Sequence, residues 1–318
     1  MRTGNGLDAA ELAAVRALVA EAATADDGQD GIDAHRLAQV AAGRSETPTA
    51  GHPGTVAVLA QAGGTSGEAA EAAGDGARLA AYAQVVRADR RWEAELVVAP
   101  SARGDLVPLG TELLTAAFAE VARQGGGPVH LWALFATDAH GKLAEAVGLE
   151  FSRDLWQMRR PLPVGEPFEI ETRPFRPGED EEAWVRVNNK AFAWHPEQSG
   201  WTVEEVRRHE AEDWFDPEGF LLHEWHGRLA GFCWTKVHAD REPPLGEIYV
   251  IAVDPTAAGL GLGRKLTLAG LDYLAKQGLT VGMLYVDATN EPAVRLYERL
   301  GFTLHHVDRA FAGEVSPA

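Results

Sequence analysis

The amino-acid sequence predicts an α/β fold that occurs twice in tandem along 318 residues. The segment Leu245 to Lys265, LGEIYVIAVDPTAAGLGLGRK, runs from an apolar strand through a glycine-dense turn into a helix. That strand has a counterpart upstream, because Trp92 to Pro100 parallels Gly246 to Pro255 and a proline closes both. A chain of this length can form two hydrophobic cores. We therefore expect two domains, at residues 1–160 and 166–318.

Two further pairs of segments support the repeat. The strand that begins at Val129 parallels the strand Gly282 to Val286. The stretch Lys142 to Phe151 parallels Val294 to Phe302, and each is a helix pattern ended by a glycine. Two copies of one fold are the simplest explanation of this order.

The region between the copies is marked by prolines. Met158 to Pro167 holds three of them, which indicates a boundary. After it the second copy is expected to restart with a strand at Phe168 to Thr172 and a helix around Glu181 to Phe192. A further apolar strand is expected at Leu229 to Thr235.

Composition limits the class of protein. The hydrophobic content of 46% is typical of a globular protein, and no apolar run approaches the ~20 residues of a membrane span. The single cysteine, Cys233, indicates a reducing cytoplasm without disulfides. A net charge of -18 argues against a nucleic-acid partner. We expect a cytoplasmic monomer that binds neither nucleic acid nor membrane.

The glycine-dense turn is the first candidate for a site. Gly259, Gly261 and Gly263 let successive backbone N–H groups at a helix N-terminus point at an anion. The spacing fits neither a Walker loop nor a dinucleotide fingerprint. A second helix follows the next strand, with Asn290 as its expected N-cap and Gly301 as its expected end.

This order of strand, glycine turn, helix, strand and Asn-capped helix with a tyrosine resembles the Gcn5-related N-acetyltransferase (GNAT) family. The resemblance implies two domains, each a mixed, mostly antiparallel sheet flanked by helices, and acetyl-CoA as the cosubstrate. At Ala258 the family usually has Gln or Arg, but most phosphate contacts are expected from backbone amides. The residues that the resemblance assigns to acetyl-CoA are Ile251, Ala252, Val253, Ala258, Gly259, Leu260, Gly261, Leu262, Gly263, Arg264, Asn290, Ala293 and Arg295.

A narrower resemblance runs through most of the chain and is densest in the second copy. The segments Val187 to Thr202, Trp214 to Gly219 and Gly231 to His238 look like those of the mycothiol synthases, a family of tandem acetyltransferases. It implies acetylation of the cysteine amine of 1D-myo-inositol 2-(L-cysteinylamino)-2-deoxy-glucopyranoside, the last step of mycothiol biosynthesis. The alternatives are an N-acetyltransferase for another small amine and a catalytically silent CoA-binding module.

Residue roles follow from this chemistry, in which an ammonium loses a proton and a thiolate gains one. Glu247 is expected to be the base and Tyr297 the acid; a solvated strand-start carboxylate and a packed aromatic are the respective alternatives. The resemblance implies that amides of Ile251 to Val253 hold the thioester carbonyl at a bulge. It also implies that Glu197, Lys236, Tyr285 and Glu247 contact the substrate; a solvated charge for Glu197 and a strand-end charge for Lys236 are the alternatives.

The first copy is expected to be catalytically degenerate. Its loop after Pro100 has two glycines, Gly104 and Gly110, an interrupting Pro108 and an aspartate. No metal is expected, because the histidines, among them His238, lack the paired ligand spacing of a zinc site. We interpret them as solvated or core residues, and Cys233 as a buried, inert thiol.

Overall fold

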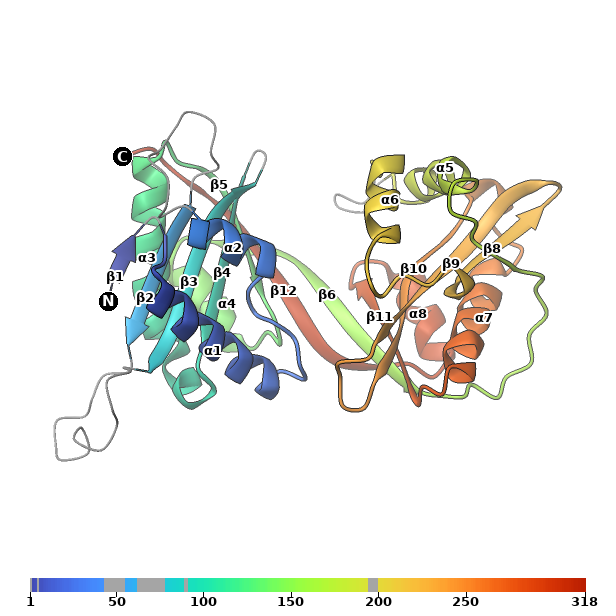
Figure 1. Cartoon of the computed structure of the whole chain (residues 1–318), viewed down its shortest axis with the longest axis horizontal. Coiled ribbons are helices and arrows are strands. Elements are labelled where there is room, and N and C mark those ends of the chain that lie inside the picture. Colours follow the sequence, from blue (N-terminus) through green and yellow to red (C-terminus); the bar gives the residue numbers. More distant parts are fainter. Residues whose placement is uncertain (1, 5, 43–54, 62–77, 89–90, 194–199) are drawn as a thin grey trace. The chain divides into compact units, whose positions relative to one another are not determined.

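The computed structural model describes residues 2–4, 6–42, 55–61, 78–88, 91–193 and 200–318, which form two compact units (Figure 1). Unit 1 comprises Met1–Leu155 and His306–Ala318, and unit 2 comprises Trp156–His305. The strands β6 (Glu150–Pro161) and β12 (Thr303–Val315) each continue from one unit into the other.

The units begin and end at other residues than the domain boundary expected from the prolines. Met158 to Pro161 do not form a linker but are the last residues of β6. The C-terminal segment belongs to unit 1, because Arg309 to Val315 of β12 pair with the strand β5. The division into domains at residues 1–160 and 166–318 stays a prediction.

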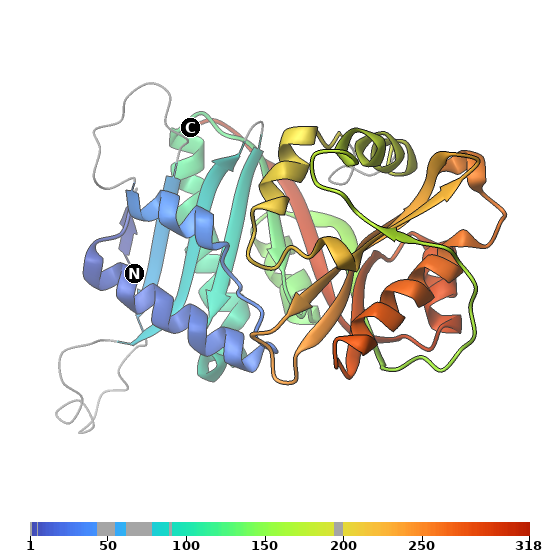
Figure 2. The ribbon, with the colours of Figure 1, turned by 45° about the vertical axis from the view of Figure 1, so that its right-hand side comes forward.

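Unit 1 is a sheet with helices on both faces (Figure 2). Its strands lie in the order β1-β2-β3-β4-β5-β12. One core joins α1 and α2 to the sheet, and another joins α3 and α4 to it. The elements are β1 (Arg2–Gly4), α1 (Ala9–Ala25), α2 (Ala34–Ala42), β2 (Thr55–Gln61), β3 (Leu79–Ala88), β4 (Arg91–Val98), the 3-10 helix η1 (Pro100–Asp105), α3 (Leu106–Arg123), β5 (Gly127–Ala133) and α4 (Asp138–Ala146).

Unit 2 repeats this plan, with the strand order β6-β11-β10-β9-β8-β7. Helices α5 and α6 lie on one face of the sheet, and α7 and α8 lie on the other (Figure 1). The elements are β7 (Arg173–Pro174), α5 (Glu181–Ala191), α6 (Val203–Glu210), the 3-10 helix η2 (Pro217–Gly219), β8 (Phe220–Trp225), β9 (Arg228–His238), β10 (Leu245–Val253), the 3-10 helix η3 (Pro255–Ala257), α7 (Leu262–Lys276), β11 (Val281–Asp287) and α8 (Glu291–Arg299).

Helix ends in unit 2 follow the local sequence signals. Asn290 is the N-cap of α8 and accepts a hydrogen bond from the Ala293 N–H at 3.3 Å, as predicted. Gly301 follows α8 with a φ of +79°, which a glycine adopts without a steric penalty. The prediction of a strand at Phe168 to Thr172 was wrong, because none of these residues lies in a strand and the two-residue β7 begins only after them, at Arg173. Phe168 and Ile170 instead pack against the core of the unit, which explains their apolar pattern.

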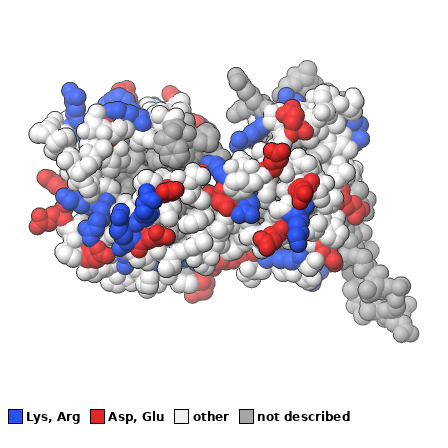
Figure 3. Space-filling model, turned by 180° about the vertical axis from the view of Figure 1, so that it is seen from behind, with Lys and Arg blue, Asp and Glu red and all other residues white. Residues whose placement is uncertain are grey.

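No helix within the described part of the chain is long and apolar enough to cross a membrane. Acidic and basic side chains are interspersed on the face drawn in Figure 3. The net charge of -18 is therefore not gathered into one patch on that face.

The expectation that Gly110 lies in a loop was wrong as well. Gly110 lies inside α3, where it is buried. A Cβ at this position would lie 2.7 Å from Cδ2 of Leu143 and 3.1 Å from Cδ2 of Leu96. Gly110 therefore lets α3 approach α4 and the sheet closely.

Replacement of Gly110 by leucine should accordingly destabilise the protein by about 1–3 kcal/mol, because a larger side chain overpacks the core. Gly104→Leu is the matched control, since nothing lies within 4 Å of a Cβ at that position. Chemical denaturation measures both variants. Equal free energies of unfolding for the two variants would show that α3 does not pack tightly against Leu143 and Leu96 at Gly110.

Candidate active site

The register of β9 and β10 brings three polar side chains to one face of the unit 2 sheet. Glu247 and Lys236 are direct partners across the two strands, and His238 pairs with Leu245, two residues further along. Because side chains alternate along a strand, Lys236 and His238 share the face of Glu247. Tyr285 of β11 shares it too, since Met283 pairs with Glu247. This is the face that carries α5 and α6.

A β-bulge lies beside these residues. The register of β10 against β9 shifts between Ile248 and Val250, so Tyr249 is an extra residue. We expected the bulge at Ile251 to Val253, but these residues pair in regular register with β9. The sequence alone does not reveal which residue of an apolar strand is left unpaired.

Glu247 is a buried carboxylate with a histidine partner. Its exposed fraction is 6%, and its Oε2 lies 2.7 Å from Nε2 of His238. Among the residues that the structure describes, this is the one hydrogen bond of the Glu247 side chain. A buried carboxylate is costly unless it is hydrogen-bonded, so His238 stabilises its placement here.

Lys236 is directed toward aromatic rings. Its Nζ lies 4.3 Å from the ring centroid of Trp214 and 5.4 Å from that of Tyr249, which are cation–π distances. Burial, with the carboxylates of Glu247 and Glu212 adding to it, raises the pKa of Tyr249 to about 12. Tyr249 therefore keeps its proton and remains a neutral ring beside the ammonium.

The sheet opens next to Glu247. The parallel pairing of β10 with β11 extends from Leu245–Val281 to Ile248–Leu284 and ends there, whereas β10 stays paired with β9 as far as Val253. In an antiparallel pair, every second residue directs its N–H away from the partner strand. Asp254 donates its N–H to the Ala230 carbonyl of β9, so the N–H groups of Ile251 and Val253 point toward the gap and that of Ala252 points toward β9.

The glycine-dense turn follows at the end of β10. Gly259 and Gly261 have φ angles of +85° and +68°, and Gly261 is the N-cap of α7. The N–H groups of Leu262, Gly263 and Arg264 open the helix, so they have no partner within it. No acidic residue lies in this first turn, and nothing lies within 4 Å of a Cβ built on Gly259 or Gly261. The turn can receive a phosphate.

Other residues assigned to acetyl-CoA surround this turn. Ala258 and Leu260 are exposed in it. Arg264 forms an ion pair with Glu166, and Arg295 forms one with Glu291 at 2.8 Å. The Asn290 side chain caps α8, so it is engaged with Ala293.

The two tyrosines occupy different surroundings. Tyr297 lies on α8 and is 7% exposed, and burial raises the pKa of its hydroxyl well above the ordinary value. It therefore carries its proton at neutral pH. The Tyr285 hydroxyl accepts a hydrogen bond from Nε2 of the buried Gln157 at 2.8 Å. Glu197 lies outside the described residues.

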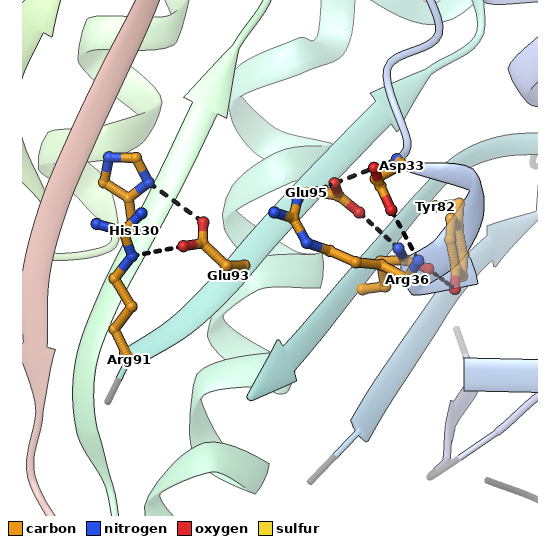
Figure 4. Close-up of polar contacts among 8 residues, drawn as sticks. Asp33, Arg36, Tyr82, Arg91, Glu93, Glu95 and His130 are labelled. Atoms are coloured by element: carbon orange, nitrogen blue, oxygen red, sulfur yellow. Dashed lines mark hydrogen bonds and ion pairs between the residues drawn. The ribbon is translucent and has the colours of Figure 1, made fainter. Parts of the chain in front are cut away.

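Unit 1 contains a counterpart of Glu247 with different partners (Figure 4). Glu93 of β4 pairs with His130 of β5 in parallel register, as Glu247 pairs with Met283. Its carboxylate lies 2.5 Å from Nε of Arg91 and 3.2 Å from Nδ1 of His130. Burial pushes the pKa of Glu93 up, but the hydrogen bonds from His130 and Arg91 outweigh it and leave this pKa below its ordinary value.

The second carboxylate of β4 is engaged as well. Glu95 accepts hydrogen bonds from Arg36 at 2.6 Å, from Gln84 at 2.5 Å and from the Asp33 N–H at 3.2 Å. The β3–β4 pair has no register shift, and the 3-10 helix η1 replaces the glycine turn. Within its described residues, unit 1 thus lacks a counterpart of the β10 bulge and of the glycine turn. No group of three or more metal-ligating side chains was found among the residues described.

Sequence reasoning missed two features of this site. We interpreted His238 as a solvated or core residue, and we assigned no role to Tyr249. Strand register would have revealed His238, but the pairing of β9 with β10 cannot be read from either strand alone.

Comparisons with known proteins agree with this geometry. The model of the acetyltransferase (GNAT) family matches residues 182–302. The chain is 44% identical over 310 residues to a mycothiol acetyltransferase of Thermomonospora curvata, covering 96% of this chain and 94% of that protein. It is 41% identical over 299 residues to one of Rhodococcus jostii, covering 90% and 95%.

Solved structures extend the fold match to the whole chain. A GCN5-related N-acetyltransferase from Sphaerobacter thermophilus has a TM-score of 0.66 and 25% identity, covering 100% of this chain and 96% of that one. A tandem GNAT protein from the clavulanic acid biosynthesis pathway has a TM-score of 0.63 and 15% identity, covering both chains fully, and shows the fold alone. The predicted fold class, two tandem GNAT domains, is confirmed. The chain belongs to the mycothiol acetyltransferase family.

Proposed function

We propose that this protein, an acetyl-CoA-dependent N-acetyltransferase by family, acetylates the cysteine amine of 1D-myo-inositol 2-(L-cysteinylamino)-2-deoxy-glucopyranoside. The observation that carries the proposal is a buried carboxylate, Glu247, at the point where β10 and β11 separate. We further propose that the protein works as a cytoplasmic monomer, without metal, nucleic acid or membrane. The acidic composition supports the absence of a nucleic-acid partner, and the single buried cysteine supports a cytoplasmic location.

The opened sheet and the glycine turn fit acetyl-CoA. The pyrophosphate would lie on the N–H groups of Leu262, Gly263 and Arg264, next to Gly259 and Gly261, whose positive φ angles favour glycine and which carry no side chain to block the approach. The pantetheine arm would enter the gap between β10 and β11. Acetyl-CoA supplies the acetyl thioester, and amides of Ile251 to Val253 would hold its carbonyl oxygen.

Proton transfer is assigned to two side chains. Glu247 accepts a proton from the substrate ammonium, so that the amine nitrogen can attack. Its carboxylate also attracts the cationic substrate before transfer. Tyr297 keeps its proton at neutral pH and donates it to the departing sulfur. Glu247 lies on β10, on the sheet face that carries α5 and α6, whereas Tyr297 comes from α8 on the other face.

The polar head of the substrate is assigned to the residues around Glu247. Lys236 and Tyr285 lie on the Glu247 face and offer an ammonium and a hydroxyl to sugar oxygens. The rings of Trp214 and Tyr249 hold the Lys236 ammonium in place. Glu197 completes the proposed set.

We propose that unit 1 does not catalyse the transfer. Glu93 is held by Arg91 and His130, and its lowered pKa makes it a weak base. Its strand also lacks the bulge of β10. A supporting role in packing remains for this unit.

Substitution of Gly261 by valine should raise the KM for acetyl-CoA by at least about tenfold, because a branched side chain at a positive φ strains the turn and blocks its amides. Gly278→Val is the matched control: Gly278 lies beyond the other end of α7 with a φ of +85° and open surroundings. Steady-state kinetics with varied acetyl-CoA distinguish them. An equal rise in both variants would place the phosphates elsewhere.

Glu247→Gln keeps the shape of the side chain and removes its basicity, so kcat should fall by roughly 10²–10⁴-fold. The KM for acetyl-CoA should change little. Glu93→Gln in unit 1 is the control and should leave kcat within about twofold, since a residue outside the catalytic step does not alter it. Near-normal turnover in Glu247→Gln would refute the assignment of the base.

Lys236→Ala should raise the KM for the cysteinyl pseudo-disaccharide by about 10–100-fold and leave the KM for acetyl-CoA unchanged, because a charged hydrogen bond to the substrate is lost. Lys276→Ala, which removes an exposed lysine of α7, is the control. Free cysteine and spermidine should be much poorer substrates than the full precursor. Comparable kcat/KM values for all three amines would contradict the substrate assignment.

A further inference from the structure

The imidazole of His238 has no role in the proton transfers described above, yet it contacts the proposed base. Its Nε2 lies 2.7 Å from Oε2 of Glu247, and the exposed fractions of the two side chains are 18% and 8%. Both residues lie on the same sheet face, on adjacent strands. The contact is therefore built into the strand register.

We propose that His238 is a positioning residue for Glu247. It donates its Nε2–H to Oε2 and fixes the carboxylate, which leaves Oε1 for the ammonium of the substrate. The inference rests on the proposed function of Glu247 as the base.

The direction of the hydrogen bond follows from the chemistry of the pair. An ionised carboxylate can only accept hydrogen bonds. The ring nitrogen that faces it must therefore carry the hydrogen, whether the imidazole is neutral or charged. The pair has the same logic as a histidine and an aspartate in a catalytic triad, with the roles of base and orienting group exchanged.

Lys236 does not take this role, although it lies directly opposite Glu247. Its ammonium lies over the rings of Trp214 and Tyr249, and within the described residues it forms no ion pair with Glu247. A single lateral partner at Oε2 therefore holds the carboxylate.

The equivalent glutamate of unit 1 shows the opposite arrangement. Glu93 accepts from Arg91 with one oxygen and contacts His130 with the other. Both of its oxygens are thus engaged, whereas no residue in the described part of the chain pairs with the Oε1 of Glu247. The number of hydrogen-bond partners therefore distinguishes the carboxylate of Glu93, which has a structural role, from that of Glu247, which can receive a substrate.

A double-mutant cycle between His238 and Glu247 tests the proposal. His238→Ala should lower kcat by about 10–100-fold, since a small misplacement of a catalytic group has an effect of this size. The KM for acetyl-CoA should not change, which also shows that the site is folded. In the Glu247→Gln background the same substitution should add less than about a twofold loss, because residues that act as a unit are not additive.

Two further variants make the test specific. The side-chain amide of His238→Gln can reach the place of Nε2, so this variant should recover kcat to within about fivefold of the wild type, because the donated hydrogen bond is kept. His223→Ala is the control, since that histidine lies on β8 and contacts the backbone carbonyl of Glu171 instead of a carboxylate.

Three results would overturn the inference. Equal losses from His238→Ala in both backgrounds would mean that His238 acts independently of Glu247. A His238→Gln variant as slow as His238→Ala would mean that hydrogen-bond donation is not its contribution. Wild-type turnover in Glu247→Gln would instead refute the proposed base, and this inference with it. The Glu247→Gln single variant alone distinguishes that case from the other two.

Discussion

The early end of the pairing between β10 and β11 is the constraint on which the unit 2 site depends. Four pairs hold the two strands together, and beyond Ile248 the strand β10 has a partner on one side only. This leaves backbone amides without strand partners next to a buried carboxylate. The bulge at Tyr249 lies at the same point. Because the extra residue shifts the alternation of side chains, the residues after it face the opposite side of the sheet from what the residues before it would predict.

The two copies show how one topology supports different chemistry. Each unit has a parallel strand pair with a glutamate at its start, Glu93 in unit 1 and Glu247 in unit 2. In unit 1, burial raises the pKa of Glu93, but hydrogen bonds from His130 and from the Arg91 guanidinium outweigh it, and the lowered pKa weakens this carboxylate as a base. In unit 2 one histidine contacts the carboxylate, and the bulge and glycine turn are present. The two units therefore share a strand order and differ in the partners of the glutamate, in the bulge and in the glycine turn.

Much of the fold could be predicted from the sequence because its signals are local. The cap at Asn290, the stop at Gly301 and the glycine turn before α7 each depend on a few adjacent residues. Other features could not be predicted, because they depend on pairing between distant strands. The bulge at Tyr249, the contact between His238 and Glu247 and the burial of Gly110 in α3 are of this kind. Phe168 and Ile170 read as a strand although they only pack against the core.

The most direct test of the central claim is a crystal structure of the protein with CoA and the acetylated product bound. The account predicts that the acetylated nitrogen lies within about 3.2 Å of an oxygen of Glu247, a hydrogen-bond distance for a base and its proton donor. It also predicts the product carbonyl at the amides of Ile251 to Val253. A product whose acetyl group lies instead beside Glu93 in unit 1 would contradict it.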